Sequence, residues 1–161
     1  MANCGPIIVE LGQDPTAEKC WNAIEEIVRM ERKIFPKHES LAKSFREELR
    51  KRNCGLLYSQ TEAGEIVGYV MYAWPSSLYA SITKLAVKEN HRSQGHGEAL
   101  LKAAVHKCKT RKIKRISLHV DPSRIAAVSL YQKLGFQIDK LIECYYTSDR
   151  NAYRMYLDFD D

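Results

Sequence analysis

The chain has 161 residues, of which 45% are hydrophobic and 28% charged, which is enough apolar material to build the core of one domain. The formal net charge of +5 is mild. The densest basic run, Lys107–Arg115, is predicted at a helix end, where cations are favourable, and it lacks interleaved aromatic residues. We therefore expect no nucleic-acid partner.

Three further features limit the class of protein. Apolar runs are too short to span a membrane, and the start of the chain, Met1–Pro6, has no signal-peptide character. The five cysteines are scattered, without a C-x-x-C pair or metal-ligand spacing. We expect no membrane partner, no metal and a cytoplasmic location, with the nucleus as an alternative.

The first part of the chain predicts one strand and two helices. Ile7–Leu11 has the pattern of a strand, and Asp14-Pro15 is a typical helix entry. Apolar residues at helical spacing run from Trp21 to Ile34, where Phe35-Pro36 interrupts the helix. A second helix is predicted from about Ser40 to Leu49.

Three strands follow. Leu56–Thr61 and Ile66–Trp74 are rich in strand-forming residues and are joined by the turn-like Glu62–Glu65, so they predict a hairpin. After Pro75–Ser77 the next strand runs over Leu78–Val87.

The last part of the chain predicts two helices and three strands. These are a helix over Glu98–Cys108, a strand over Arg115–Val120, a short helix from Ala126 to Leu134 that stops at Gly135, and final strands over Gln137–Thr147 and Asn151–Phe159. The order is β-αα-βββ-α-β-α-ββ. It predicts a single α/β domain over residues 1–161, with a mixed central sheet flanked by helices.

The hexapeptide Arg92-Ser93-Gln94-Gly95-His96-Gly97 lies between a predicted strand and a predicted helix. A glycine-bearing turn that opens a helix presents backbone N–H groups and the positive end of the helix dipole to an anion. The stretch is not a P-loop, because Gly97 is followed by Glu98-Ala99, and it lacks the third glycine of a dinucleotide fingerprint. What remains is R-x-x-G-x-G after a Leu-Ala-Val strand.

This motif resembles the pyrophosphate loop of the GNAT acetyltransferase superfamily, and the predicted order of elements is the GNAT order. Further segments extend the resemblance over almost the whole chain: Phe35-Pro36, Leu118-His119-Val120, Ala127-x-x-x-Tyr131-x-x-x-Gly135-Phe136 and Tyr145-Tyr146. Within the superfamily they are most similar to the branch that acetylates N-terminal α-amines, in particular the NatE-type catalytic subunit and the bacterial enzymes that act on ribosomal proteins.

The resemblance implies acetyl-CoA as co-substrate. It places backbone groups of Leu85, Ala86 and Val87 along the pantetheine. It assigns the pyrophosphate to Arg92 and to the amides of Ser93, Gln94, Gly95, His96, Gly97 and Glu98. Arg124 stands where relatives have a cofactor-contacting asparagine, and it could reach a phosphate or simply be solvated.

Two residues are candidates for proton transfer. The resemblance places Tyr131 beside the thioester sulfur, where a positioned phenol could pass a proton to a thiolate; on helical spacing alone it could be a core aromatic. His119 lies in Ile116–Val120, where alternation puts it with Ser117 on the face opposite the apolar residues. A neutral imidazole there could accept a proton from an amine, or His119 could be structural.

For the acceptor, the resemblance implies walls made by Phe35, Pro36, Lys37, Tyr145 and Tyr146. Tyrosines there could bind a peptide backbone. Ser81 stands near the position at which relatives often carry a glutamate or tyrosine base, so His119 would act alone or with Tyr79. Lys37 replaces a small apolar residue, which favours an acidic or polar first residue over a methionine.

The function expected from these residues is transfer of an acetyl group from acetyl-CoA to an amine by direct attack, most readily the α-amine of a protein or peptide N-terminus. One alternative is a small amine, a polyamine or a lysine side chain as acceptor, with Glu39, Glu143 and Asp149 as the acidic candidates. Another is a non-catalytic subunit that only binds acetyl-CoA. An auxiliary subunit is a further candidate partner.

Overall fold

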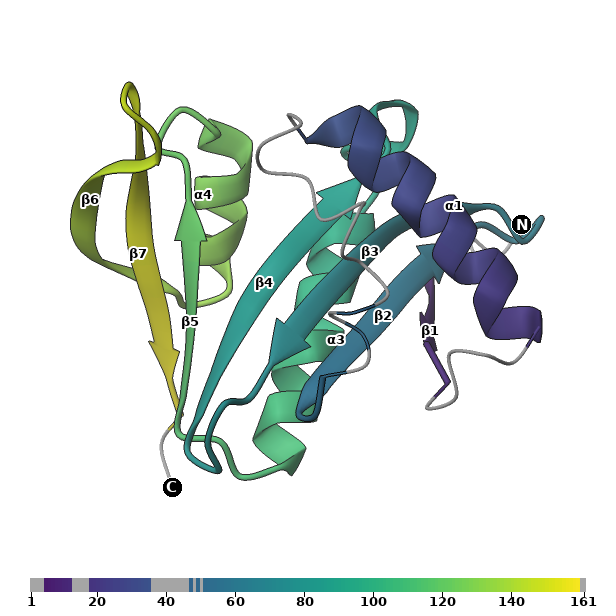
Figure 1. Ribbon diagram of the computed structural model, residues 1–161, viewed down its shortest axis with the longest axis horizontal. Helices are drawn as coiled ribbons and strands as arrows, with labels where there is room; N and C mark the ends of the chain where they lie inside the picture. Colours follow the sequence, from purple (N-terminus) through teal and green to yellow (C-terminus); the bar gives the residue numbers. More distant parts are fainter. Residues whose placement is uncertain (1–4, 13–17, 36–46, 48, 50, 160–161) are drawn as a thin grey trace. The chain divides into compact units, whose positions relative to one another are not determined.

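The computed structural model describes residues 5–12, 18–35, 47, 49 and 51–159. In chain order the elements are β1 (Ile7–Glu10), α1 (Glu18–Ile34), β2 (Cys54–Gln60), β3 (Ile66–Ala73), β4 (Tyr79–Val87), the 3₁₀ turn η1 (Glu89–His91), α3 (His96–Thr110), β5 (Arg115–Val120), α4 (Ile125–Lys133), β6 (Gln137–Thr147) and β7 (Arg150–Asp158) (Figure 1). The predicted α/β order is confirmed. The helix entry at Asp14-Pro15 lies outside the described residues, and so does nearly all of the helix predicted from Ser40 to Leu49.

The strands form one mixed sheet in the order β1-β2-β3-β4-β5-β7-β6. β4 and β5 are parallel, whereas the pairs β1–β2, β5–β7 and β6–β7 are antiparallel. The bounds of β5 and β6 are those that the sequence predicts, and the other strand ends differ by at most two residues. Differences of this size are usual, because element ends depend on the last hydrogen bond counted. η1 was not predicted.

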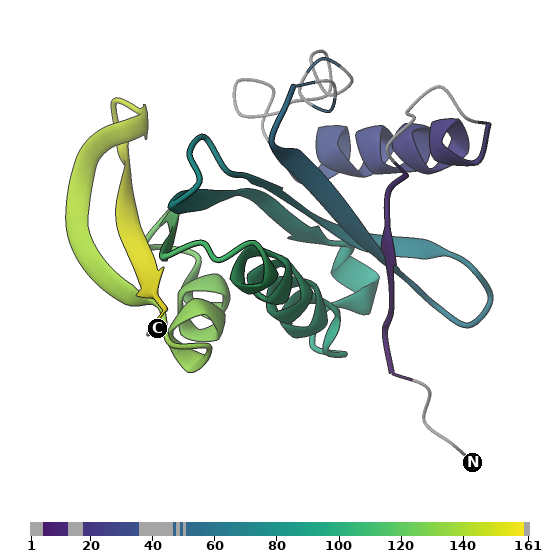
Figure 2. The same ribbon diagram turned by 90° about the horizontal axis from the view of Figure 1, so that it is seen from below.

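The chain divides into two compact units, of which the first is Met1–Tyr72 with Lys84–Ala104. In this unit α1 and α3 lie on opposite faces of the strands (Figure 2). α1 buries one apolar side against the sheet; the core there consists of Ala23, Ile24, Ile27, Met30, Phe35, Leu56, Ile66, Tyr69, Met71 and Ala86. The predicted helical spacing of Ile24 and Ile27 therefore marks the buried side of α1.

On the opposite face α3 comes very close to β3 at Gly68. A Cβ atom at this position would lie 3.0 Å from the Ala86 carbonyl oxygen, 3.1 Å from Leu100 and 3.2 Å from the Ser59 hydroxyl. All three distances are shorter than ordinary van der Waals contacts, so a methyl group there would push its neighbours apart. Gly68 thus lets the first turns of α3, at Leu100, lie directly on the sheet.

The second unit is Ala73–Thr83 with Val105–Asp161. Ile116, Leu118 and Val120 of β5 are buried, together with Met155 of β7, whereas Arg115 and His119 are exposed. This confirms the face that strand alternation predicts for His119. α4 ends in a turn at Gly135, whose φ of 99° suits glycine and which packs against Leu157 of β7.

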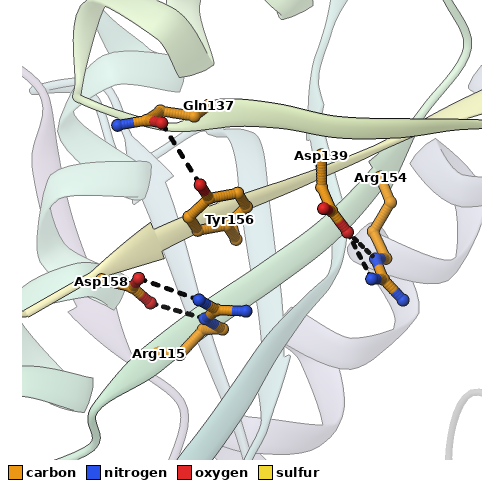
Figure 3. A network of polar contacts seen from close by, with 6 residues as sticks. All are labelled: Arg115, Gln137, Asp139, Arg154, Tyr156 and Asp158. Atoms are coloured by element: carbon orange, nitrogen blue, oxygen red, sulfur yellow. Dashed lines mark hydrogen bonds and ion pairs between the residues drawn. The ribbon is translucent and has the colours of Figure 1, made fainter.

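Polar side chains of β5, β6 and β7 interact on the sheet of this unit (Figure 3). Arg115 donates to Asp158 at 2.9 Å, and its guanidinium lies 4.4 Å above the Tyr156 ring. Arg154 donates from Nε to Asp139 at 2.7 Å. The antiparallel register places Arg154 directly opposite His119, so these pairs share the His119 face.

In the part of the chain that the structure describes, no helix is both long and apolar enough to cross a membrane. Among the same residues, His, Cys, Asp and Glu side chains do not gather into a group of three that could hold a metal ion. The described cysteines, Cys20, Cys54, Cys108 and Cys144, are free thiols.

Candidate active site

The loop between β4 and α3 has the backbone geometry of an anion site. Arg92, Ser93, Gln94 and Gly95 are exposed, and the φ angles of Ser93 and Gly95 are 62° and 88°. Positive φ suits glycine and is uncommon for other residues. A Cβ atom at Gly95 would meet nothing within 4 Å, so the space beside this backbone is open. A bulky group can therefore approach the main chain at Gly95.

Helix α3 starts from this loop and points its N-terminus toward it. The first helical hydrogen bond runs from the Ala99 N–H to the Gly95 carbonyl at 3.0 Å. The amides of His96 and Gly97 precede it and lie outside the helical ladder, where they favour an anion together with the helix dipole. Arg92 adds a guanidinium that is anchored to the end of β4, because its Nε donates to the Val87 carbonyl at 3.1 Å.

The side chain of His96 does not belong to the exposed loop. It is only 6% exposed, and its Nδ1 lies 3.1 Å from the Ser59 hydroxyl on β2. Burial, followed by the charge of His91, lowers the pKa of His96 below its ordinary value. Its predicted contact with a cofactor therefore concerns the backbone amide alone.

The remaining residues predicted beside the cofactor in this unit are main-chain candidates. Ala86 is buried in the core next to α1, and Leu85 and Val87 are half-buried. Glu98 forms an ion pair with Lys102, one helical turn on, at 3.2 Å. That the backbone of Leu85, Ala86 and Val87 runs along a pantetheine stays a prediction.

In the second unit His119 stacks on Tyr145. The ring centroids are 4.5 Å apart and the planes differ by 9°. One face of the imidazole is thus covered although the residue is exposed overall. This partial burial lowers the pKa of His119 below its ordinary 6.5, and the positive charges of Arg154 and Lys140 lower it further. At neutral pH the imidazole is neutral and can accept a proton.

Two more tyrosines belong to the same unit. The ring of Tyr146 meets that of Tyr145 edge-on at 4.9 Å. Burial, then the neighbouring Tyr145, raises the pKa of Tyr146 to about 12. Tyr131 on α4 is 7% exposed, and burial raises its pKa to about 12, while the charge of Arg124 opposes the shift. Both hydroxyls therefore stay protonated at neutral pH and can donate hydrogen bonds.

Ser81 lies on the same face as His119. In the parallel pairing of β4 and β5, Ser81 is opposite Ser117, and His119 follows two residues later on β5. Side chains two residues apart on a strand point to the same face. The structure therefore places Ser81, His119, Tyr145, Tyr146 and Tyr131 in one unit, and of these it brings His119, Tyr145 and Tyr146 into ring contact.

Phe35, the predicted acceptor wall at the end of α1, lies in the first unit and is buried. The ammonium of Lys84 sits 3.7 Å above its ring and 3.7 Å from the carboxylate of Glu31. Glu31 is fully buried and accepts a hydrogen bond from the Tyr69 hydroxyl. Pro36 and Lys37 lie outside the described residues, as does Glu39.

Sequence reasoning missed Asp121 and Arg150. Asp121 is 8% exposed and accepts hydrogen bonds from the backbone and hydroxyl of Ser123, at 2.9 and 2.8 Å. Arg150 donates to it from the start of β7 at 3.0 Å. The run Asp121-Pro122-Ser123 is a recognisable turn signal, but it does not indicate a partner far along the chain.

The family model described as the Acetyltransferase (GNAT) family matches residues 21–136. This match covers most of the chain, including the loop at Gly95, His119 and Tyr131. The chain belongs to the GNAT acetyltransferase family. The matched region ends before β6, which carries Tyr145 and Tyr146, so the family assignment itself does not bear on the two tyrosines.

Relatives with named activities match this GNAT chain over most of its length. An N-alpha-acetyltransferase of Sulfolobus acidocaldarius is 32% identical over 144 residues, which is 82% of this chain and 84% of that protein. An N-alpha-acetyltransferase of Sulfurisphaera tokodaii is 28% identical over 144 residues, covering 82% of this chain and 85% of the relative. Both alignments are longer than the region that the family model matches.

A solved structure confirms the fold. The ribosomal-protein-S18-alanine N-acetyltransferase of Escherichia coli superposes with a TM-score of 0.80 over 97% of this chain and 95% of that one. Its sequence is 21% identical, so the likeness concerns the GNAT fold and not the acceptor.

GNAT acetyltransferases use acetyl-CoA, and the loop before α3 fits the pyrophosphate of that molecule. The backbone at Gly95 is open, the amides of His96 and Gly97 stand at a helix N-terminus, and Arg92 supplies a cation. These features suit a diphosphate, and that this loop binds the pyrophosphate of acetyl-CoA stays a prediction.

Proposed function

We propose that this GNAT acetyltransferase acts on the α-amine of a protein or peptide N-terminus. The observation that carries the proposal is the stacked pair His119–Tyr145, in which a neutral imidazole is held on an open polar face beside two tyrosine rings. The relatedness to two N-alpha-acetyltransferases over 82% of the chain supports the same acceptor.

His119 is a base suited to an α-amine. An α-ammonium titrates near roughly 8 and a lysine ε-ammonium near roughly 10.4. The pKa of His119 lies below 6.5 and so below that of either ammonium. Each pKa unit between the ammonium and His119 makes proton transfer to the imidazole less favourable. At neutral pH an appreciable share of α-amines is already deprotonated, whereas almost no lysine side chains are. His119 therefore assists the first acceptor far better than the second.

Tyr131 stabilises the departing sulfur by hydrogen bonding in this proposal. Acetyl-CoA supplies a thioester, whose reaction with an amine forms a C–N bond and breaks the C–S bond. With a pKa of about 12, the phenol of Tyr131 is a weaker acid than a thiol, which titrates near roughly 8.5. Full proton transfer from Tyr131 to a thiolate is therefore unfavourable, and a donated hydrogen bond is the better role.

The tyrosines of β6 form the acceptor wall. Tyr145 is 46% exposed, and Tyr146, with a pKa of about 12, keeps its hydroxyl proton. Phenolic hydroxyls can bind the backbone amides of a peptide, which an N-terminal substrate offers and a free polyamine does not. Acidic side chains on the same hairpin, Glu143 and Asp149, are exposed and are the features that would suit a polyamine instead.

The test is release of free CoA with a panel of short peptides that differ in their first two residues. The panel includes the same peptides with a blocked N-terminus, a blocked peptide with one lysine, and spermidine. We expect turnover that requires a free N-terminus and that falls by roughly 10²-fold or more in His119→Gln. Turnover only with spermidine or the lysine peptide would overturn the proposal. Binding of acetyl-CoA without any turnover would identify a non-catalytic subunit.

A further inference from the structure

An ion pair joins the turn after β5 to the start of β7. Arg150 donates to the Asp121 carboxylate through Nε at 3.0 Å, and a terminal guanidinium nitrogen lies 2.9 Å from the same carboxylate oxygen. The side chains are only 26% and 11% exposed, respectively. A charged hydrogen bond that is partly withdrawn from water is stronger than one on the surface. The pair therefore holds two turns that lie far apart in the sequence.

Asp121 also shapes the start of α4. Its second carboxylate oxygen accepts from the backbone and hydroxyl of Ser123, and its carbonyl accepts from the Arg124 N–H at 3.0 Å. Arg124 is the N-cap residue of α4, the helix that carries Tyr131. The orientation of the carboxylate is thus defined by the two donors of Ser123, and the position that its other oxygen offers to Arg150 is defined with it.

Arg150 is also connected to His119, through contacts with the rings of Tyr146 and Tyr145. Its guanidinium lies 4.9 Å above the ring of Tyr146. Tyr146 packs edge-on against Tyr145, and Tyr145 is stacked on His119. A continuous series of contacts therefore connects Asp121 to the imidazole of His119. Each contact restricts the orientation of the next side chain.

We propose that Asp121 and Arg150 are a positioning pair, which fixes the turn between β6 and β7 and so holds the Tyr145–Tyr146 wall against His119. In this role both residues act through the tyrosines and not on the reacting atoms. This inference rests on the proposed function, since it assigns the pair to the acceptor side of the same site. It predicts that loosening the pair uncovers His119 and misplaces the acceptor, while acetyl-CoA binding is retained.

The experiment compares Arg150→Gln, Asp121→Asn and the double variant. Asparagine at 121 keeps an oxygen that accepts from Ser123 but loses the charge that binds Arg150. We expect each single variant to lower kcat/KM for a free N-terminal peptide by roughly 10- to 100-fold, mainly through the acceptor KM. We expect the double variant to lose no more activity than either single variant. Both substitutions break the same ion pair, so their effects on kcat/KM do not add. Arg150→Lys, which keeps the charge, should recover part of the loss.

A second readout does not depend on turnover. The pKa of His119, followed by NMR titration of its ring, should rise toward the ordinary value in Arg150→Gln, because the stacked tyrosine no longer covers the imidazole. The thermal stabilisation by acetyl-CoA should stay unchanged. A wild-type protein that turns over no peptide would refute the proposed function, and the His119 titration would still decide the positioning role.

The matched control is Asp158→Asn. It removes an exposed ion pair with Arg115 at the other end of the β5–β7 pairing and leaves the tyrosine wall intact. This variant should keep the His119 pKa and the wild-type kcat/KM. The inference is overturned if Arg150→Gln leaves the His119 pKa unmoved, if its kcat/KM stays within about twofold of wild type, or if the losses of the two single variants multiply in the double variant.

Discussion

The imidazole of His119 and the phenol ring of Tyr145 lie parallel, with centroids 4.5 Å apart and planes inclined by 9°. They come from β5 and β6, and in the sheet β7 lies between these strands. The pairing of β6 and β7 loses its regular register between Ile142 and Thr147, where Cys144 has a φ of 55°. This irregular stretch carries Tyr145, and a bulge of this kind redirects side chains. The stack thus couples the predicted base to the proposed acceptor wall.

Removal of the Tyr145 ring should raise the pKa of His119. Burial is the main cause of the low value, so Tyr145→Ala exposes the imidazole and returns the pKa toward 6.5. Because the neutral form is the base, the acid limb of the kcat/KM profile should move to higher pH. NMR titration of His119 measures the shift directly. Tyr145→Phe keeps the stacked ring and should keep the low pKa, and an unchanged pKa in Tyr145→Ala would show that the stack has no such effect.

Replacement of Tyr131 by phenylalanine should lower kcat by roughly 10²-fold, because one hydrogen-bond donor to the developing thiolate is lost. The aromatic packing against Phe136 is retained, so the folded state should persist. The pH profile provides an independent check. Since the pKa of Tyr131 is about 12, its ionisation should not lower the wild-type rate up to about pH 10. Equal kcat values for Tyr131→Phe and wild type would remove Tyr131 from the mechanism.

Gly95→Glu should abolish the thermal stabilisation that acetyl-CoA gives, since a carboxylate would repel the pyrophosphate at the helix N-terminus. The chain offers a matched control in Gly64, which has the same φ of 88° and, like Gly95, no atom within 4 Å of the place that a Cβ would take. Gly64→Glu should suffer similar backbone strain but keep the stabilisation. Melting temperatures with and without acetyl-CoA distinguish the two. A Gly95→Glu protein that acetyl-CoA still stabilises fully would show that the anion binds elsewhere.

Buried His96 should make folding stability fall in mild acid. Its pKa in the folded protein is lowered, so below about pH 6.5 the unfolded chain binds this proton more readily and stability decreases as the pH falls. In His96→Gln, which can still hydrogen-bond to Ser59, the melting temperature should depend less on pH between about 7 and 5. His106→Gln, which replaces an exposed histidine on the same helix, should retain the wild-type dependence. Parallel curves for wild type and His96→Gln would contradict the assignment.

Some features of the site can be predicted because they depend on neighbours in the chain. Strand alternation places His119 on the polar face of β5, and the glycine of the loop indicates the positive φ at position 95. Helical spacing also indicates that the side chain of His96 is buried. It is four residues before Leu100 and eight before Ala104, both buried, so its side chain belongs to the buried face of α3.

The pair Asp121–Arg150 could not be predicted in this way. An acidic residue after a strand and an arginine in a turn are ordinary features of surfaces. They meet because β7 pairs with β5 in antiparallel register, which brings the beginning of β7 next to the end of β5. The contact between Lys84, Phe35 and Glu31 likewise depends on how α1 lies on its strands.

The sequence by itself determined the order of the elements, the GNAT family and the residue types at the loop, on β5, on α4 and on β6, because periodicity, glycine positions and short motifs are properties of local chain. The tertiary structure alone decided which of these side chains touch and how readily they give or take protons. The pKa of Tyr131 and that of His119 depend on water displaced by atoms from distant segments. Desolvation is set by packing, and no local pattern encodes which segments pack together.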